Sequence, residues 1–415
     1  MRQTSKIVIL GAGFSGVYTA QHLLKDYSGF DFTITIVNKT NYFLFTPLLH
    51  EVATGGLNRQ HVVESIREIF RGKPVDFYLS EARKIDFKKK IVFSDGHEIP
   101  YDFLVIASGS ETHFHNILGA KEHAFTLKSL SDANRLRDHF IATFELASKI
   151  SDDTQRRRLL SFAVIGGGPT GIELIAEMAE LFFETFQQYY PHLHLKDDVT
   201  LFLVHRGSEL MPQFSLWLRK KAKNVLTKKG VQIRLGSGVS EITNEGIFLS
   251  NQDFLPASTV VWVAGVQSCF PEMFPEPSLD VNNRIVVDSF LRVKGYENVF
   301  ALGDIACFLA DNENPLPMLA QVSVSQSDTV AMNIKNFLSD RPLKPFRYRL
   351  KGILVSLGRW KACGEIFGFH VSGPFAWFLW RTIYFFKFVS MRKRFKIALD
   401  WTLNIFYPRD ISQTH

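Results

Sequence analysis

Short apolar runs that end in glycine-rich turns occur at two distant places in the chain. The first lies in KIVILGAGFSGVYTA and the second in FAVIGGGPTGIELIA. In each, an apolar run of strand length precedes the turn and helix-like spacing follows it. A second strand-like run comes next, FTITIV in the first case and VTLFLV in the second. The pattern predicts two strand–turn–helix–strand units of an α/β protein.

Both turns have GxGxxG spacing, for which there is a physical reason. The first glycine permits a tight turn, the second lets a pyrophosphate approach the backbone, and the third lets the helix pack closely on the strand. The helix N-terminus then offers N–H groups and a partial positive charge to the phosphates. One such turn is weak evidence, but two in this context predict two dinucleotide sites. The glycines are Gly11, Gly13 and Gly16, and Gly166, Gly168 and Gly171.

A third mark is NVFALGDIA, residues 298–306. Here an apolar strand is expected to end at Gly303 and Asp304, before a helical stretch. An aspartate at a strand end can accept hydrogen bonds from the hydroxyl groups of a flavin side chain. A Gly-Asp pair alone is a common turn, so this mark gains meaning only beside the two glycine turns.

Composition limits the class of protein. The 415 residues allow two or three domains, and 46% hydrophobic with 21% charged residues disfavours wholesale disorder. A net charge of +7 favours nucleic acid, an anionic membrane or an acidic ligand. Cys269, Cys307 and Cys363 form no CxxC pair, so we interpret them as buried small hydrophobes in a reducing compartment. The five residues before the first strand are too few for a signal peptide.

The character of the chain changes from Phe346 onward. The tail contains PFAWFLWRTIYF followed by FKFVSMRKRFKIALDWTLNIF. Aromatic residues at helical spacing predict a broad aromatic surface formed by Trp377, Trp380, Tyr384, Phe385 and Phe388. Interleaved cations are Arg381, Lys387, Arg392, Lys393, Arg394 and Lys396.

We interpret this tail as two short helices lying in a membrane interface, with rings at the acyl boundary and cations at the phosphates. A dimer interface or a buried helix is the alternative reading, and the same tail could also pair two subunits as a homodimer. Nucleic acid is not an expected partner, because the cations alternate with bulky apolar residues suited to lipid.

Together these marks resemble the flavoproteins with two dinucleotide-binding domains. Within that group the chain is similar to the type II NADH dehydrogenases, which are single-subunit NAD(P)H:quinone oxidoreductases. The resemblance spans essentially the whole chain. It is carried by LVIASG, VVWVAGV, NYFLFTPLLHEVATG, GGGPTGIELIAEM, LPMLAQVSVSQ and AWFLW.

The resemblance implies two Rossmann-like domains and a C-terminal helical segment that associates with the membrane. The FAD domain would comprise residues 1–119 and 280–340, the NAD(P)H domain residues 120–279, and the membrane and quinone domain residues 341–415. The implied activity is non-proton-pumping electron transfer, with a hydride passing from NAD(P)H to FAD and two electrons then passing to a membrane quinone. The protein would be peripheral, on the cytoplasmic face of the inner membrane.

The same resemblance assigns residues to these cofactors. FAD is expected at Gly11, Gly13, Gly16, Thr46, Pro47 and Asp304, and NADH or NADPH at Gly166, Gly168, Pro169, Thr170 and Gly171. Further cofactor contacts are expected at Asn38, Lys39, Ser108, Gly109, His205, Arg206, Gly265, Gly303 and Gln321.

Because the cofactors perform the redox chemistry, we expect neither a catalytic triad nor a metal. Glu173 is the candidate for a proton path and Gln321 for orienting a quinone carbonyl. The alternative reading of Glu173 is an ordinary acid of the first helical turn, which would complement the helix dipole.

Two positions depart from the usual acid at the end of the second strand of each unit. The first holds Asn38, followed by Lys39, and the second holds His205, followed by Arg206. An acid repels the 2′-phosphate of NADPH, whereas His and Arg attract it. We therefore hypothesise that NADPH is accepted at least as well as NADH. An exposed basic turn without such a role is the alternative.

The quinone side departs as well. The resemblance implies two glutamines four positions apart, and Gln321 fits the first. The second position holds Ser325, with Gln326 directly after it. A smaller hydroxyl leaves more room and one fewer amide, so the preference for a quinone head group stays open.

The same sequence features admit three rival functions. A disulfide-type oxidoreductase needs a cysteine pair where this chain has NYFLFTPLLHEV, which contains no sulfur. A sulfide:quinone oxidoreductase needs cooperating cysteines, and the three present do not form a recognisable set, although a spatial pair stays open. A non-enzymatic flavoprotein sensor that docks at the membrane is the third alternative.

Overall fold

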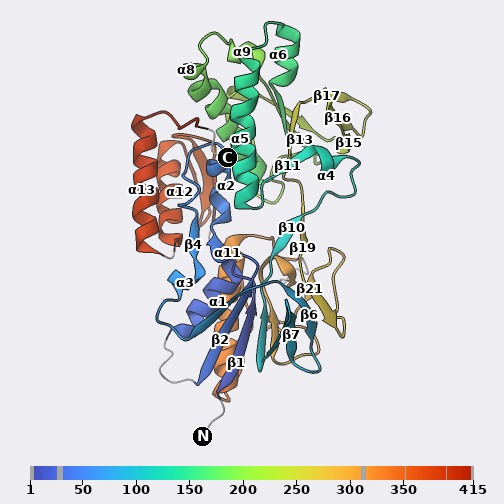
Figure 1. Cartoon of the computed structure of the whole chain (residues 1–415), viewed down its shortest axis with the longest axis vertical. Coiled ribbons are helices and arrows are strands. Elements are labelled where there is room, and N and C mark those ends of the chain that lie inside the picture. Colours follow the sequence, from blue (N-terminus) through green and yellow to red (C-terminus); the bar gives the residue numbers. More distant parts are fainter. Residues whose placement is uncertain (1–3, 26–30, 310–314, 351, 389, 413–415) are drawn as a thin grey trace. The chain divides into compact units, whose positions relative to one another are not determined.

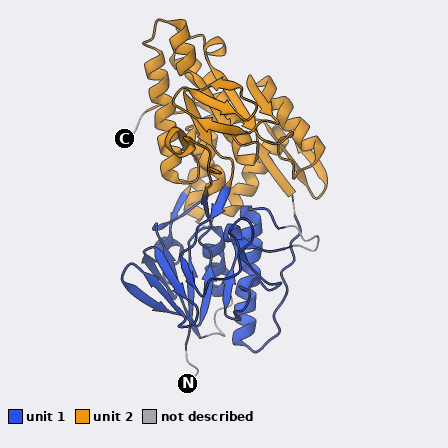
Figure 2. Ribbon diagram, turned by 90° about the vertical axis from the view of Figure 1, so that its right-hand side faces the viewer, with its two compact units in different colours: residues 1–44, 63–111, 266–350 blue, residues 45–62, 112–265, 351–415 orange. Residues whose placement is uncertain are grey.

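The protein is described here by a computed structural model that covers residues 4–25, 31–309, 315–350, 352–388 and 390–412. The chain forms two compact units, each built from three segments (Figure 2). Unit 1 comprises residues 1–44, 63–111 and 266–350, and unit 2 comprises residues 45–62, 112–265 and 351–415. These bounds differ from those of the three domains that were predicted from their functions. The division of the chain by function stays a prediction.

Unit 1 is built on a five-stranded parallel sheet with the order β22-β9-β1-β2-β5. Its central strand β1 precedes the first glycine turn, and its residues 7–10 are buried because both faces of the sheet are covered. Helix α1 packs against α11. The bounds are β1 Ser5–Leu10, α1 Phe14–Leu24, β2 Phe32–Asn38, β5 Val75–Leu79, β9 Phe103–Ile106, β22 Val299–Ala301 and α11 Ala320–Leu338.

Smaller elements complete unit 1. A second sheet has the order β20-β6-β7-β8, in which β6, β7 and β8 are antiparallel. The remaining bounds are β3 Tyr42–Leu44, β4 Val63–Ser65, α3 Ile66–Ile69, β6 Ala82–Asp86, β7 Ile91–Ser94, β8 His97–Pro100, β19 Val266–Ser268, β20 Glu272–Phe274, β21 Ile285–Val286, η4 Gly303–Ile305 and β23 Ala306–Cys307. Strand β10, Ser110–Thr112, lies at the boundary between the units.

Unit 2 repeats this plan with the parallel sheet β11-β18-β12-β13-β14. The strand before the second glycine turn, β12, again lies at the centre, between the next strand β13 and the later strand β18. Neighbours on both sides make this the switch point at which open α/β sheets bind ligands. The bounds are β11 Ala124–Thr126, β12 Ser161–Ile165, α7 Pro169–Glu180, β13 Thr200–His205, α10 Leu216–Lys228, β14 Val231–Leu235 and β18 Thr259–Trp262. The predicted pair of Rossmann-like units is therefore confirmed.

Helices and a small sheet surround the second parallel sheet (Figure 1). Helix α7 continues into a π-helical turn, η3, and five phenylalanines from α5, β12 and η3 pack together. The bounds are η2 Thr46–Leu48, α2 Leu49–Ala53, α4 Ala120–His123, α5 Leu130–Ala147, α6 Asp153–Leu159, η3 Leu181–Phe186, α8 Gln187–Tyr189, α9 Leu195–Asp198, β15 Val239–Ile242, β16 Gly246–Leu249 and β17 Phe254–Pro256.

The tail forms a three-stranded antiparallel sheet and two helices. The sheet order is β24-β25-β26, and α12 and α13 lie side by side (Figure 1). The bounds are β24 Gly352–Ser356, β25 Ala362–Ile366, β26 Phe369–Ser372, α12 Pro374–Lys387 and α13 Met391–Phe406. The two helices were predicted, but the sheet was not. Among the helices of the described residues, none is long and apolar enough to cross a bilayer.

Two local expectations were wrong. Of the aromatic surface predicted for the tail, Trp377, Trp380 and Phe388 are buried. The exposed rings are other phenylalanines of α12 and α13, namely Phe375, Phe378, Phe386, Phe395 and Phe406. The helical stretch expected after β22 is also not found there. The chain instead forms the short 3₁₀ turn η4, which leads directly into β23.

Candidate functional site

The first glycine turn fits a bound pyrophosphate. Gly11 has a φ of +98°, and a Cβ there would lie 2.3 Å from the carbonyl oxygen of Ala107, so only glycine fits. A Cβ on Gly16 would lie 1.9 Å from the oxygen of Gly11. A Cβ on Gly13, in contrast, would meet no atom within 4 Å. The space beside Gly13 is therefore the cradle that a phosphate can enter.

The second turn has the same three properties. Gly166 has a φ of +127° and packs on the backbone of Val263, while a Cβ on Gly171 would lie 2.0 Å from the oxygen of Gly166. A Cβ on Gly168 would again meet nothing within 4 Å. The helices that follow, α1 and α7, begin without a side-chain cap, so their first N–H groups remain suited to an anion. Pro169 and Thr170 form the first turn of α7.

The residues at the ends of β2 and β13 play equivalent parts. The N–H of Ala12 donates to Asn38 Oδ1 (3.0 Å), and the N–H of Gly167 donates to His205 Nδ1 (3.2 Å). His205 can accept at Nδ1 only as the neutral tautomer that carries its proton on Nε2. Burial, and then the charge of Arg206, lower the pKa of His205. His205 is thus a neutral clamp on the turn, and the only permanent cation of this pair is Arg206.

Gly265, shortly after β18, packs against a histidine ring. Gly265 has a φ of +104°, and a Cβ there would lie 2.2 Å from His115 Nε2. Burial, then His113 and Arg206, lower the pKa of His115. The ring of His115 therefore occupies the space that a side chain at position 265 would need.

In unit 1, the predicted residues Ser108 and Gly109 lie between β9 and β10, and Gly303 and Asp304 lie in the turn η4. Ser108 Oγ donates to the oxygen of Cys269 (2.5 Å), and Ser110 Oγ donates to Asp304 Oδ2 (2.5 Å). Gly303 has a φ of +80°, and a Cβ there would lie 2.2 Å from Ser15 Oγ at the start of α1. Asp304 therefore follows a turn that packs on the helix of the first nucleotide unit.

The glutamines of α11 have different roles. Gln326 is buried, and its Oε1 accepts from the N–H of Gly303 (2.7 Å). Gln321 and Ser325 are half-buried and lie one helical turn apart on α11. Gln326 therefore holds the Gly303 turn and does not replace the amide missing at Ser325.

Three further predicted positions lie as follows. Lys39 makes an exposed ion pair with Glu81 (3.3 Å). Thr46 and Pro47 begin the short turn η2, which leads into α2 of unit 2. The structure thus divides the residues expected around FAD between the two compact units.

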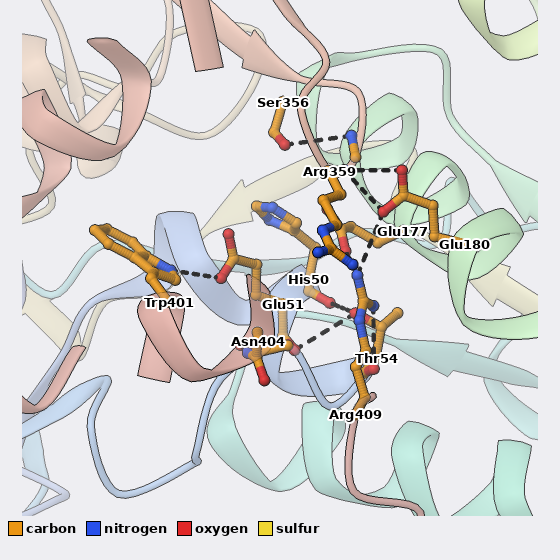
Figure 3. A network of polar contacts seen from close by, with 12 residues as sticks. His50, Glu51, Thr54, Glu177, Glu180, Ser356, Arg359, Trp401, Asn404 and Arg409 are labelled. Atoms are coloured by element: carbon orange, nitrogen blue, oxygen red, sulfur yellow. Dashed lines mark hydrogen bonds and ion pairs between the residues drawn. The ribbon is translucent and has the colours of Figure 1, made fainter. Parts of the chain in front are cut away.

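Unit 2 contains a polar network that the sequence did not reveal (Figure 3). Glu173, Glu177 and Glu180 are buried on one face of α7, at positions i, i+4 and i+7. Arg409 Nη2 lies 2.5 Å from Glu177 Oε2 and 3.5 Å from Glu180 Oε2, and its Nη1 donates to the oxygen of Thr54.

Two cations and a backbone N–H satisfy Glu180. Besides Arg409, Lys229 Nζ lies 2.5 Å from Glu180 Oε1, and the N–H of Arg359 donates to both carboxylate oxygens at 2.8 Å. Burial alone would lower the pKa of Arg409, but Glu177 and Glu180 reverse this and raise it. These pairs hold the C-terminal segment against α7.

Glu51 and Glu173 differ from this paired set. Burial raises the pKa of Glu51 to about 7, and burial together with Glu51 and Glu177 raises the pKa of Glu173 to about 8. Glu51 Oε2 accepts from Trp401 Nε1 (3.0 Å), and Glu173 Oε1 accepts from the N–H of Ser356 (3.1 Å). His50, whose pKa burial lowers to about 3, lies 3.9 Å from Glu173.

A cavity of about 200 Å³ opens beside this network. Its floor is formed by buried side chains, among them Glu51, Glu177 and Glu180. Its rim includes exposed residues, namely Glu184, Gln188, Arg359, Phe406 and Tyr407. Sequence reasoning found Glu173 alone, although the repeat of acids on one face of α7 was a readable signal.

The cysteines and the other potential metal ligands add little to the description of the site. Cys307 and Cys363 are buried as expected, whereas Cys269 is only half-buried. Among the described residues, no group of three His, Cys, Asp or Glu side chains is arranged to hold a metal.

Two cradles of this kind, each at the centre of a parallel sheet, are typical of proteins that bind two dinucleotides. Residues 5–327 match the pyridine nucleotide-disulphide oxidoreductase family, and residues 350–410 match the NDH2 C-terminal domain.

Similar proteins agree over nearly the whole length. A probable NADH dehydrogenase from Dictyostelium discoideum is 32% identical over 99% of this chain and 91% of its own. A type II NADH:quinone oxidoreductase from Staphylococcus saprophyticus is 30% identical over 91% of this chain and 94% of its own. The solved structure of NDH2 from Plasmodium falciparum in complex with NADH has a TM-score of 0.91 at 20% identity, covering 99% of this chain and all of that one.

The chain belongs to the type II NADH:quinone oxidoreductase family. It is accordingly an FAD-dependent oxidoreductase that uses NADH and a quinone, and the sequence-based assignment of fold, activity and cofactors is confirmed.

Proposed function

We propose that this chain is a non-proton-pumping NAD(P)H:quinone oxidoreductase that works at a membrane surface. The observation that carries the proposal is the duplicated cradle, in which Gly13 and Gly168 each leave space at an uncapped helix N-terminus. FAD, when bound, accepts a hydride from the nicotinamide and passes two electrons to the quinone.

The residues of the chain would bind and orient these groups. Unit 1 would hold FAD through the cradle at Gly13 and through Asp304, while unit 2 would hold the nicotinamide nucleotide through the cradle at Gly168. The open space at both glycines supports this assignment, because any side chain there would fill it. Gln321 is proposed to orient a quinone carbonyl, and Glu173 to hold a proton for quinone reduction.

Use of NADPH is part of the proposal and depends on Arg206. His205 is neutral while it accepts from Gly167, so it offers an N–H at Nε2 but no charge. The position nevertheless lacks the acid that would repel a 2′-phosphate, and Arg206 follows it directly. We therefore expect NADPH to compete with NADH.

Membrane docking is proposed for the outer faces of α12 and α13. Large apolar side chains are exposed there, namely Phe375, Phe378, Ile383, Phe386, Phe395, Leu399, Leu403 and Phe406. The first turn of α13 carries basic residues and no acid, which opposes the helix dipole but suits an anionic lipid surface. We propose a peripheral protein on the cytoplasmic face of the inner membrane, with a homodimer through the same tail as a further possibility.

The proposed activity is tested by purifying the protein in detergent, identifying its flavin, and measuring oxidation of NADH and NADPH with several quinones in lipid. We expect bound FAD and quinone-dependent turnover with both nucleotides. A protein that stays colourless after FAD is supplied, or that oxidises neither nucleotide with any quinone, contradicts the proposal.

Docking is tested by sedimentation with anionic liposomes. Replacing Phe378 and Phe395 together by serine should reduce the bound fraction, because both rings are exposed and apolar. Phe254→Ser, at an exposed ring of β17, is the matched control and should sediment like the wild type. Equal binding by all three proteins contradicts docking through α12 and α13.

A further inference from the structure

The proposed reaction needs a proton from solvent, and the inference that follows rests on that proposed function. Its balance is NADH + H⁺ + quinone → NAD⁺ + quinol, so the hydride supplies two electrons and one proton, and solvent supplies the other proton. A site that excludes water requires titratable side chains to deliver that proton.

The cavity of unit 2 offers an entry. Exposed residues such as Glu184 and Gln188 line its rim, whereas Glu51, which is 4% exposed, lies in its floor. Glu51 is thus a buried carboxyl group that solvent in the cavity can approach. It belongs to α2, which packs directly against α7.

The acids of the network divide into two kinds. Glu177 and Glu180 are paired with Arg409, and Glu180 also with Lys229, so ion pairs hold them. Glu51 accepts a hydrogen bond from neutral Trp401, and Glu173 accepts one from a backbone N–H. A close cation favours the ionised carboxylate, whereas the hydrogen bonds to Glu51 and Glu173 come from neutral donors, so these two acids take up a proton more readily.

Charged groups on several packed elements act on the two acids. Arg381 of α12, Arg409 of the C-terminal segment and Glu177 of α7 act on Glu51. Glu51 and Glu177 in turn act on Glu173, so the charge on one acid raises the proton affinity of the other. Burial is the largest cause for both acids and raises the pKa of Glu51 to about 7 and that of Glu173 to about 8, so each can hold a proton near neutral pH.

We propose that Glu51 and Glu173 form a two-carboxyl relay that takes a proton from the cavity beneath α13 and supplies it for quinone reduction. Glu51 takes up a proton from solvent as it passes one to Glu173, and Glu173 becomes ionised when its proton is consumed. His50, adjacent to Glu51 and 3.9 Å from Glu173, stays neutral near pH 7, because burial lowers its pKa to about 3.

The first test titrates the protein as isolated, without turnover. Infrared spectroscopy between pH 6 and 8 should show the C=O band of a protonated buried carboxyl group, and Glu51→Gln should remove one component of it. Glu184→Gln, on the rim of the same cavity, is the matched control and should leave the band unchanged. A Glu51→Gln band identical to that of the wild type overturns the assignment.

The second test separates proton delivery from electron transfer. Ferricyanide accepts electrons without protons, so Glu51→Gln should lose roughly 10-fold or more of quinone turnover at pH 8 and keep ferricyanide turnover near the wild-type rate. Glu51→Asp, which restores a carboxyl group, should recover part of the loss. Equal losses with both acceptors, or no loss with quinone, overturn the relay.

Different experimental results would contradict the relay and the proposed function. If the wild type reduces no quinone, the proposed function fails. If the wild type reduces quinone and Glu51→Gln does so equally well, only the relay fails. Thermal melting and flavin content, measured for every variant, show whether Glu51→Gln retains the fold.

Discussion

Arg409→Met removes the cation that joins the C-terminal segment to α7. The guanidinium group lies 2.5 Å from Glu177 and 3.5 Å from Glu180, and the Arg409 and Glu177 side chains are only 14% and 6% exposed. Glu180 keeps Lys229 and the N–H of Arg359 in the variant. The cost therefore falls on Glu177, which loses its ion pair in a buried position.

Two estimates give the stability that Arg409→Met should cost. Removing one partner of a buried ion pair typically costs about 3–5 kcal/mol. A stranded glutamate can instead take up a proton, which for an ordinary glutamate costs about 1.4 kcal/mol for each pH unit above about 4.3, or about 4 kcal/mol at pH 7. The two values agree. The second estimate also predicts that the cost falls to about 2 kcal/mol at pH 5.5, because protonation becomes easier.

Thermal melting at pH 7 and pH 5.5 measures this effect. At about 2–4 °C per kcal/mol for a unit of this size, the midpoint should fall by about 8–16 °C at pH 7 and by roughly half as much at pH 5.5. Glu177→Gln in the Arg409→Met background should recover most of the loss, because no charge is then stranded. A loss that is equal at both pH values, or one that Glu177→Gln does not relieve, would refute the reasoning.

Four other substitutions test the site. Gly13→Ala should fold but lose FAD, which the flavin content of the purified variant measures. Gly168→Ala should keep FAD but require a much higher NADH concentration, which the KM for NADH measures. In both variants the added Cβ enters only the space for the phosphates. Arg206→Glu should lower the ratio of kcat/KM for NADPH over NADH by roughly 10-fold or more, and an unchanged ratio would remove Arg206 from the recognition of the 2′-phosphate. Glu173→Gln should gain stability over the wild type as pH rises from about 4.5 to 8, since Glu173 ionises over that range only when unfolded; a pH-independent difference in melting midpoint would contradict this.

The two nucleotide units could be predicted because their signal is local. The three glycines of each turn are within six residues. The first and third of each turn are required by close backbone contacts within the same strand–turn–helix unit or with the chain after the adjacent strand, whereas the second faces open space. The acid network could not be predicted in this way, because its partners are distant in sequence. Trp401 and Glu51 are 350 positions apart, and Arg409 and Glu177 are 232 apart.

The tail shows a different limit of the sequence. Aromatic residues occur on every side of α12, so helical spacing could not tell which rings face inward. The structure buries Trp377 and Trp380, and it stacks Arg381 over Trp377 and Trp401, at 3.8 and 4.9 Å from the ring centroids. A residue expected to contact lipid phosphates therefore lies inside, where burial lowers its pKa to about 10.

Helix α13 has two faces with separate roles. Its outer face exposes Phe395 and Leu399, whereas its inner face supplies Trp401 to Glu51 and contributes to the cavity wall. Deleting the tail from Pro374 would remove the apolar surface but also strand Glu51, Glu177 and Glu180 without Trp401 and Arg409. Such a truncation would lose stability whatever the role of the outer face, so a loss of liposome binding could not be assigned to docking. Only substitutions on the exposed face, with the inner face intact, can separate docking from the integrity of the acid network.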